Sequence, residues 1–287
     1  MRLALPLLVL SFALCLSGCA DKHVVLPRRP KMIRSIVSLS PGTSEIIASD
    51  ADSTTLKGRT AACNFPGNMM GPIPIVASTK PDYEKIQGIK PDLIVYDKGL
   101  YSDQDIEKLK STKAELFGID AETVDDFVKE LYLLGSKLAW ETRFNDYIER
   151  IQQEKVSAES APLNPKPRVA IVMPGSGGND MICGTKGFLA DVVKISGGEM
   201  VGPAIDNFGM LNAEAFVGQN PDVIVTGGTK GDLSSLKMIQ DDPRFKTINA
   251  VKLNRIQPLD QDVLYRRGGR VDNLIKAMHQ VISPEKK

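Results

Sequence analysis

Side chains that could carry catalysis are scarce in this chain of 287 residues. Histidine is the usual general base at neutral pH, yet the chain has only His23 near its start and His279 near its end. The run 174–178 is no nucleophile elbow, because Pro174 replaces the first glycine, and Asp180 replaces the third glycine of a dinucleotide-binding loop. Phosphate-binding loops and clustered metal ligands are missing too. We therefore predict that the protein is not an enzyme and carries no cofactor or metal of its own.

Polar and aromatic side chains gather instead in segments that follow predicted strands. Arginine, tyrosine and phenylalanine at such positions suit a large, flat, partly anionic ligand, through stacking and charge-assisted hydrogen bonds. Single members also have structural explanations, because Phe65 and Phe208 can pack beneath loops and Arg59 can pair with a carboxylate. As a set, the predicted ligand-binding residues are Ser40, Pro41, Thr43, Arg59, Cys63, Phe65, Lys98, Tyr101, Ser176, Cys183, Phe208, Gly228, Tyr265 and Arg266.

The four cysteines are expected to have different fates. Cys15 and Cys19 belong to an N-terminal export segment, so Cys63 and Cys183 are the only pair available for a disulfide. Each half of the chain holds one of them, in a segment predicted to lie near the ligand. A disulfide would join the two halves, and two unpaired thiols are the alternative that we favour.

The chain contains an internal repeat. Residues 84–95 and 214–225 share, at an offset of 130, an acidic residue, an apolar residue two positions later, a Pro-Asp pair seven positions later and a short apolar run. This pattern predicts a short helix ended by proline, whose ring disfavours helical geometry in the preceding residue, and then a buried strand. A repeat of this length indicates a duplicated lobe rather than a solenoid unit.

Predicted strands alternate with predicted helices in both halves. Residues 35–39 form a predicted strand that leads into a helix starting at Glu45, and residues 168–173 are the corresponding strand of the second half. Such alternation favours parallel sheets with helices on both faces, and ligands of these sheets bind beyond the carboxyl ends of the strands. We predict an α/β protein with an N-terminal lobe at residues 34–122 and a C-terminal lobe at residues 166–287.

Residues 123–165 are predicted to connect the lobes. Apolar residues recur at helical spacing from Val124 to Ile151, and a stretch rich in Ser, Ala, Pro and Asn follows at residues 157–165. We predict one long helix, kinked near Gly135, rather than a flexible linker. A helical connector would hold the lobes at a nearly fixed angle.

The N-terminus has the pattern of an export signal. The apolar run after Arg2 ends at Leu16, which is too short to span a membrane. Small residues directly before Cys19 match bacterial lipoprotein processing, in which cleavage exposes a cysteine that is then acylated; an ordinary secretory signal is the alternative. We predict a signal peptide at residues 1–18, a lipid at Cys19 that anchors the protein to a membrane outside the cytoplasm, and a polar tether at residues 19–33.

Charge and length narrow the function classes further. The chain carries 36 basic and 35 acidic residues, a net charge of +1, which gives no electrostatic case for binding nucleic acid. Its length exceeds that of one typical domain and suits two lobes that each bury a core.

Several motifs occur in a fixed order along the chain. They are the strand with Leu-Ser-Pro and Thr-x-Glu at 35–45, the loop ending in Phe-Pro at 58–66, both Glu-to-Pro-Asp segments, the helix and Gly-Gly-Glu turn at 187–199, and Arg266-Arg267-Gly268-Gly269-Arg270. Together they resemble the periplasmic-binding family for iron-siderophores, haem and cobalamin, and their order and spacing, from about residue 34 to residue 283, make the resemblance specific. The last motif lacks both prolines of the family's usual Arg-Pro-Gly-Pro-Arg.

The resemblance implies two Rossmann-like lobes joined by one long backbone helix, with the ligand held between the lobes. It also implies a docking role for one acidic residue on each lobe, Glu84 and Glu214, which would meet arginines of a two-fold symmetric permease. Favourable interaction with the amino end of a helix is the alternative role for both carboxylates.

We expect a monomeric binding protein that captures a ferric siderophore or a corrinoid and delivers it to an ABC permease dimer with a cytoplasmic ATPase. A haem carrier is an alternative, in which Tyr101 or Tyr265 would ligate the iron. Further alternatives are a lipid-anchored sensor or structural lipoprotein with the same fold, and a hydrolase that depends on His279.

Overall fold

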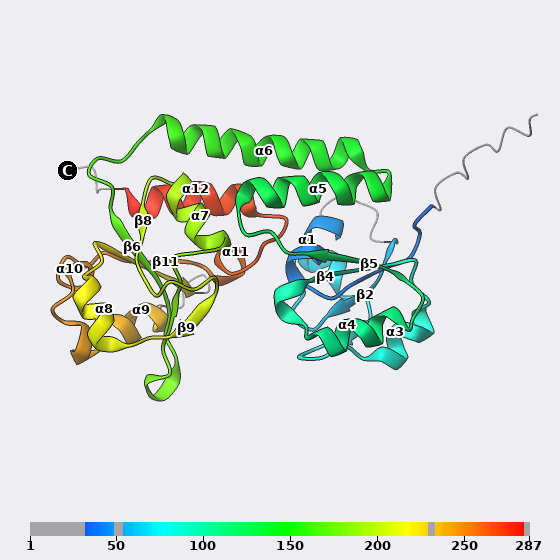
Figure 1. Cartoon of the computed structure of the whole chain (residues 1–287), viewed down its shortest axis with the longest axis horizontal. Helices are drawn as coiled ribbons and strands as arrows, with labels where there is room; N and C mark the ends of the chain where they lie inside the picture. The colour runs from blue at the N-terminus through cyan, green and yellow to red at the C-terminus, as the bar shows by residue number, and fades with distance from the viewer. Residues whose placement is uncertain (1–31, 49–53, 229–232, 284–287) are drawn as a thin grey trace, which may run out of the picture. The chain divides into compact units, whose positions relative to one another are not determined.

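The computed structural model describes residues 32–48, 54–228 and 233–283 (Figure 1). The predicted signal peptide, the lipidation site Cys19 and nearly all of the predicted tether lie outside these residues. None of the helices in the described ranges is long and apolar enough to cross a membrane. The elements from Met32 onward belong to one structural unit.

The first half of the chain forms a five-stranded parallel sheet with the order β3-β2-β1-β4-β5. Its central strands β1 and β4 are buried, as expected for a parallel sheet covered by helices. Helix α1 begins at Pro41 rather than at Glu45, because proline is well suited to the first helical position. The elements are β1 (Ile36–Ser38), α1 (Pro41–Ala48), β2 (Leu56–Thr60), α2 (Gly67–Met70), β3 (Ile75–Ala77), α3 (Tyr83–Ile89), β4 (Leu93–Asp97), the short 3-10 helix η1 (Lys98–Leu100), α4 (Asp103–Lys110) and β5 (Glu115–Ile119).

The second half forms a sheet with the order β11-β10-β6-β7-β9, and β8 pairs with β6. This sheet is mixed rather than fully parallel: β7 runs antiparallel to β6 and to β9. The reason is local, because β6 returns through a short loop into β7, and such a loop can join only antiparallel strands. The elements are β6 (Arg168–Met173), η2 (Ser176–Gly178), β7 (Met181–Cys183), α7 (Phe188–Ile195), β8 (Glu199–Met200), β9 (Phe208–Met210), α8 (Ala213–Gln219), β10 (Val223–Gly228), α9 (Ser234–Gln240), η3 (Pro243–Phe245), α10 (Asn249–Lys252), β11 (Ile256–Asp260), α11 (Gln261–Leu264) and α12 (Val271–Ile282).

The internal repeat corresponds to α3 with β4 in one sheet and to α8 with β10 in the other. Both helices begin with a side-chain cap, from Asp82 and from Asn212, which also stand 130 residues apart. Both end at a residue in the left-handed conformation, Lys90 with φ 52° and Asn220 with φ 43°. The left-handed residue therefore ends each helix, and the proline that follows starts the path into the strand.

Two helices, α5 (Val124–Leu138) and α6 (Glu141–Ser160), stand where one kinked helix was predicted. The break lies at Ala139, whose φ of 56° ends α5, and not at Gly135. Gly135 has a different role, because a Cβ there would lie 2.9 Å from the Cβ of Phe144. The glycine lets α5 and α6 pack closely against each other, and α6 leads from the first sheet to the second (Figure 1).

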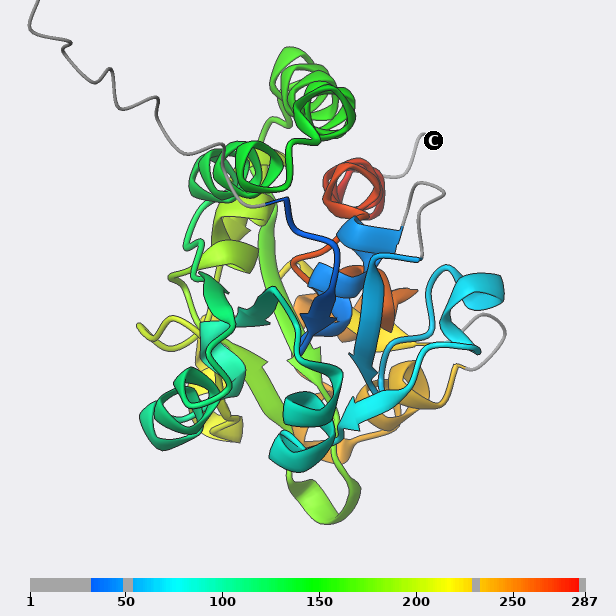
Figure 2. The same cartoon turned by 90° about the vertical axis from the view of Figure 1, so that its right-hand side faces the viewer.

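Helices α5, α6 and α12 lie side by side, as Figure 2 shows from a second direction. A single cluster of buried apolar residues runs through them and includes residues of both sheets, such as Ile36 and Leu93 of the first and Val169 and Val225 of the second. The two lobes therefore share part of one core, which restricts the angle between them more than a free connector would.

Candidate binding site

Most predicted ligand-binding residues lie at or just after the carboxyl ends of strands. In the first sheet they follow β1, β2 and β4, and in the second they follow β6 and β10 or lie in β7 and β9. Tyr265 and Arg266 come directly after α11, between β11 and α12. Segments that are far apart in the chain thus meet at equivalent ends of the two sheets.

A buried carboxylate joins the two halves at this end. Glu45 of α1 is 1% exposed, and its Oε1 accepts hydrogen bonds from Arg266 Nη1 at 3.0 Å and Arg270 Nη2 at 2.7 Å. Its Oε2 accepts a third from Arg270 Nε at 3.0 Å. Both arginine side chains are 13% exposed. Charges this deep are costly unless they are paired, so Glu45 and the two arginines depend on one another.

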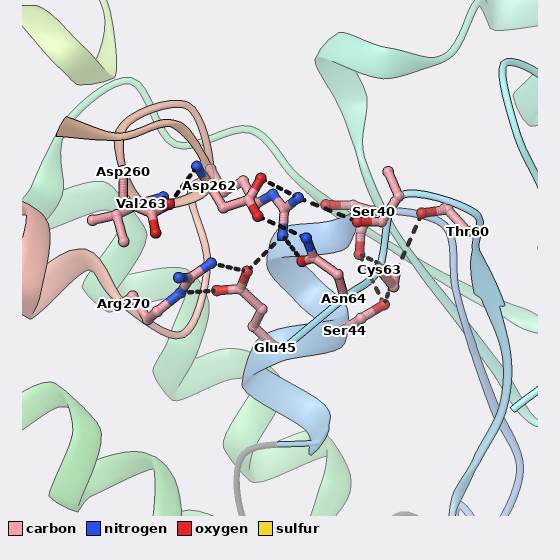
Figure 3. A network of polar contacts seen from close by, with 12 residues as sticks. Ser40, Ser44, Glu45, Thr60, Cys63, Asn64, Asp260, Asp262, Val263 and Arg270 are labelled. Atoms are coloured by element: carbon pink, nitrogen blue, oxygen red, sulfur yellow. Dashed lines mark hydrogen bonds and ion pairs between the residues drawn. The ribbon is translucent and has the colours of Figure 1, made fainter. Parts of the chain in front are cut away.

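Asn64 and Asp262 extend this arrangement, and we call the five residues Glu45, Asn64, Asp262, Arg266 and Arg270 the interlobe network (Figure 3). Arg266 donates to Asp262 Oδ1 at 2.5 Å and to Asn64 Oδ1 at 2.7 Å. The amide of Asn64 in turn donates to Asp262 Oδ2 at 2.7 Å. Four members each make hydrogen bonds to at least two others, and Arg270 makes two hydrogen bonds to Glu45. The network is therefore well satisfied, as buried polar groups require.

A second ion pair lies beside the network. Arg267 Nη2 is 2.6 Å from Asp97 Oδ1 at the end of β4, and Arg267 also donates to the carbonyl of Ala121. Tyr147 of α6 adds a contact by donating to the carbonyl of Gly268 at 2.5 Å. Residues 266–270 are therefore tied to α1, to the strand ends of the first sheet and to α6.

Two glycines, Gly42 and Gly268, let the backbone of α1 touch the backbone before α12. A Cβ at Gly42 of α1 would lie 2.4 Å from the carbonyl oxygen of Arg267, and one at Gly268 would lie 2.6 Å from the Cα of Gly42. The backbone of α1 and the backbone before α12 touch here with no side chain between them. Any larger residue would push the segment with Arg266 and Arg270 away from Glu45.

Hydroxyl groups and a thiol fill the space behind α1. Cys63 Sγ donates to Ser44 Oγ at 2.9 Å and lies 3.2 Å from Thr60 Oγ1 (Figure 3). Ser44 in turn donates to Ser38 Oγ at 2.9 Å. Ser40 and Thr43 are buried in the same cluster, where the amide of Thr43 donates to Ser40 Oγ. These predicted ligand-binding side chains contact one another and hold the loop after β2 against α1.

Both remaining cysteines are free and buried, which confirms the favoured expectation of two unpaired thiols. Cys63 belongs to the hydroxyl cluster behind α1. Cys183 ends β7, and burial raises the pKa of its thiol to about 12. A thiol with so high a pKa stays protonated and unreactive at neutral pH.

The aromatic members of the predicted set have partners within the protein. The Tyr101 hydroxyl donates to the carbonyl of Leu39 at 2.6 Å, and burial raises its pKa to about 12. The Tyr265 hydroxyl accepts from the amide of Gly227 at 2.9 Å, and its ring packs edge-on against Phe208 at 5.6 Å between centroids. Phe65 is 39% exposed and lies under the Arg270 guanidinium, 4.5 Å from it.

The two cations among the other predicted residues have partners within the protein. Arg59 donates to the carbonyls of Thr60, Cys63 and Met70, and so fixes the loop after β2. Lys98 pairs with Asp120 at 3.0 Å. Pro41 starts α1 and Gly228 ends β10, and Ser176 is exposed in η2.

A family model described as "Periplasmic binding protein" matches residues 36–263, which is most of the chain. The chain belongs to the periplasmic binding protein family. It is therefore a substrate-binding protein and not an enzyme, as predicted.

Two comparisons show how this periplasmic binding protein relates to others. It is 21% identical over 281 residues to the uncharacterized ABC transporter substrate-binding lipoprotein YvrC of Bacillus subtilis, covering 96% of this chain and 87% of the relative. The petrobactin-binding protein YclQ of the same organism is 24% identical over 213 residues, or 70% of this chain and 65% of that protein.

Among solved structures, the vitamin B12 binding protein BtuF of Vibrio cholerae aligns with a TM-score of 0.74 at 17% identity and covers 87% of this chain and 96% of its own. The periplasmic haem-binding protein RhuT of Roseiflexus aligns equally well, with a TM-score of 0.74 at 17% identity over 87% and 98% of the two chains. At these identities the likeness shows the two-lobed fold.

Glu84 and Glu214 occupy equivalent places on the two lobes of this periplasmic binding protein. Both lie in the first turn of their helices, α3 and α8, and both are exposed. The helix caps are Asp82 and Asn212 instead, since their side chains accept the backbone hydrogen bonds. Within the described ranges neither glutamate side chain has a hydrogen bond or an ion pair.

Two cavities lie away from the interlobe network. One of about 550 Å³ is formed at the amino ends of β1 to β3 and includes Ser35, Leu56 and Pro74. The other, of about 500 Å³, is formed around α7 and includes Lys166, Lys186 and Asp191. No predicted ligand-binding residue lines either cavity, and the described residues contain no cluster of His, Cys, Asp and Glu that could hold a metal ion.

Sequence reasoning quoted Glu45 and residues 266–270 as motifs but assigned only Arg266 to the site. It missed Glu45, Asn64, Asp97, Asp262, Arg267 and Arg270. Glu45 and Arg270 stand 225 residues apart, so no spacing rule pairs them. The one available signal was an acidic residue inside a strongly apolar helix, where a charge needs a partner.

Proposed function

We propose that this protein is the substrate-binding component of an ABC importer, which captures a ferric siderophore or a corrinoid between its lobes and delivers it to a permease driven by a cytoplasmic ATPase. The observation that carries the proposal is the meeting of strand-end segments from both sheets around the interlobe network. The name of YvrC supports an ABC transporter as the partner. The names of YclQ and BtuF support petrobactin and vitamin B12 as models for the ligand, and that of RhuT supports the haem alternative.

Haem is the less favoured ligand. Both tyrosines named as iron ligands already use their hydroxyl groups in hydrogen bonds, Tyr101 to Leu39 and Tyr265 to Gly227. Burial raises the pKa of both, so the phenolate that binds ferric iron is disfavoured. Siderophores and corrinoids need no such ligand, because the chelator itself surrounds the metal.

Ligand identity can be tested by titrating the purified protein with cobalamin, ferric siderophores and haem, following absorbance and intrinsic fluorescence. We expect saturable binding of a siderophore or of cobalamin, and no shift of the haem absorption band typical of tyrosine ligation. Detergent micelles without protein are the control for haem partitioning. Binding of none of these ligands would favour the rival assignment as a sensor or structural lipoprotein.

We propose that Glu84 and Glu214 dock the loaded protein onto the permease. Helices α3 and α8, which carry them, lie on the side of the protein opposite α6 (Figure 1). Exposed carboxylates that have no partner among the described residues are suited to pair with arginines of another protein. A monomer with one such carboxylate on each lobe would fit a permease built from two symmetric subunits.

The proposed location is the outer face of a membrane, through a lipid at Cys19. YvrC, which aligns along almost the whole chain, is named as a lipoprotein. Replacing Cys19 with serine removes the acylated thiol, and we expect the variant to leave the membrane fraction while its thermal unfolding stays unchanged. Ultracentrifugation of spheroplasts with immunoblotting measures this. A Cys15→Ser variant is the matched control and should remain in the membrane pellet; a Cys19→Ser variant that also remains there would exclude the lipid anchor.

A further inference from the structure

We propose that the interlobe site takes a metal chelate of little or no net charge and discriminates against polyanionic chelates. This rests on the proposed function and specifies its ligand class. It differs from the sequence-based expectation of a partly anionic ligand, which counted arginines without their partners.

The interlobe network is electrically balanced. Arg270 directs two nitrogens at Glu45, and Arg266 divides its donors among Glu45, Asp262 and Asn64. Two guanidinium groups therefore face two carboxylates, at distances between 2.5 and 3.0 Å. An anionic ligand could recruit these arginines only by replacing a carboxylate that is already buried against them, and an unpaired buried charge is strongly unfavourable.

The cations beside the network are also paired. Arg267 Nη2 lies 2.6 Å from Asp97 Oδ1. Its charge also acts on Glu130. Burial raises the pKa of Glu130 overall, and the hydrogen bond from the amide of Asp120 and the charge of Arg267 only partly oppose this rise. Lys98 pairs with Asp120, a bond that raises the lysine's pKa.

Among the described residues, Arg59 donates only to backbone carbonyls and pairs with no carboxylate. Asp260 caps α11 through the amides of Asp262 and Val263, and its negative charge acts on Arg270. Hydrogen bonds from Ser102 and Tyr83 lower the pKa of Asp105 to about 2. The positive charge of Lys80, which follows β3 in the chain, makes a smaller contribution in the same direction. Apart from Arg59, whose guanidinium is bound by backbone carbonyls, the described cations at these strand ends are thus matched by carboxylates.

Exposed apolar groups provide the contact surface that an uncharged chelate requires. Leu100 in η1 is 56% exposed directly after β4, and Phe65 is 39% exposed in the loop after β2. Phe208 and Tyr265 add partly buried rings from the second sheet. Apolar walls with a few fixed polar groups are typical of sites for small molecules whose binding does not depend on charge.

The test compares ferric chelates of similar size and different charge on the purified full-length protein. The probes are an uncharged tris-hydroxamate and a tris-catecholate of charge −3, with cobalamin as an uncharged corrinoid. We expect an uncharged probe to bind at least about a hundredfold more tightly than the tris-catecholate, a difference that corresponds to two tenfold steps in Kd. The Kd of the uncharged probe should change little between low and high salt, because screening by salt acts on charged ligands.

Charge variants sharpen the test. Asp120→Asn frees Lys98 at an exposed site where folding is not at risk, and Asp97→Asn frees Arg267. Each should improve the affinity for the tris-catecholate relative to the uncharged probe by about tenfold, the value of one additional charge pair in a partly dry site. Glu107→Gln, which breaks an exposed pair with Lys110 on α4, changes net charge equally and should leave the ratio unchanged.

The outcomes separate the two proposals. Tighter binding of the tris-catecholate, or unchanged ratios in both Asp120→Asn and Asp97→Asn, would overturn the charge inference and leave the import function standing. Failure of all three probes to bind would overturn the proposed ligand class and the inference with it.

Discussion

Replacing Glu45 with alanine is expected to destabilise the protein by about 3 to 5 kcal/mol, the usual loss when one partner of a buried ion pair is removed. Among the described residues, the substitution leaves Arg270 with no ion-pair partner and Arg266 with Asp262 as its one carboxylate partner, although both side chains stay largely buried. Thermal unfolding should show a midpoint lowered by about 6 to 20 °C, since each kcal/mol shifts the midpoint by about 2 to 4 °C in a protein of this size.

Two further variants make the Glu45 result specific. Glu107→Ala removes a carboxylate from an exposed pair with Lys110 and should barely change the midpoint. Adding Arg270→Met to Glu45→Ala removes the stranded charge and should recover part of the lost stability, because a buried charge without a partner is the main penalty. If the double variant is less stable than Glu45→Ala alone, packing rather than charge pairing explains the effect of the first substitution.

Reversing the charge of both Glu84 and Glu214 is expected to abolish ligand uptake almost completely while leaving ligand affinity normal. Arginine at either position would repel the arginines proposed on the permease, and like charges facing each other across an interface cost several kcal/mol. Each single variant should impair uptake, because the two-fold symmetric permease needs both contacts. Uptake of radiolabelled ligand by cells that express the cognate permease measures the effect, and titration of the purified variants measures affinity.

Glu149→Arg is the matched control for charge reversal. Glu149 is exposed on α6, on the opposite side of the protein from α3 and α8 (Figure 1). This variant carries the same charge change and should transport normally. Normal uptake by the Glu84→Arg, Glu214→Arg double variant would remove the docking role and leave the two carboxylates with only their favourable position near helix amino ends.

The parts of the fold that sequence predicts well are those governed by local patterns. Strand β6 was predicted with the bounds that the structure shows, because Arg168 is followed by a continuous apolar run rich in β-branched residues that ends at Met173. The repeat located α3 and α8 together with the strands after them. The break between α5 and α6 was predicted near Gly135, because glycine is a poor helix former. The helix actually ends at Ala139, which adopts the left-handed conformation although alanine does not favour it.

The candidate site was less predictable, because its polar groups acquire their roles from partners distant in the chain. The composition of residues 266–270 indicates positive charge, and only the fold reveals that Glu45 and Asp97 neutralise it. Tyr101 and Cys63 were likewise assigned to the ligand because of their position after strands. The structure adds their partners, the carbonyl of Leu39 and the hydroxyl of Ser44, which local sequence does not encode.

The contact between Gly42 and Gly268 restricts how this sequence can change over evolutionary time. Most tight contacts allow compensation, in which one residue grows while its neighbour shrinks. Here both residues are already the smallest possible, and the nearest atoms that a Cβ would meet belong to the backbone. Neither position can accept a side chain in exchange for a loss at the other, so the pair is fixed for as long as α1 and the segment before α12 keep their distance. A position with no chemistry of its own can thus be as constrained as a charged one.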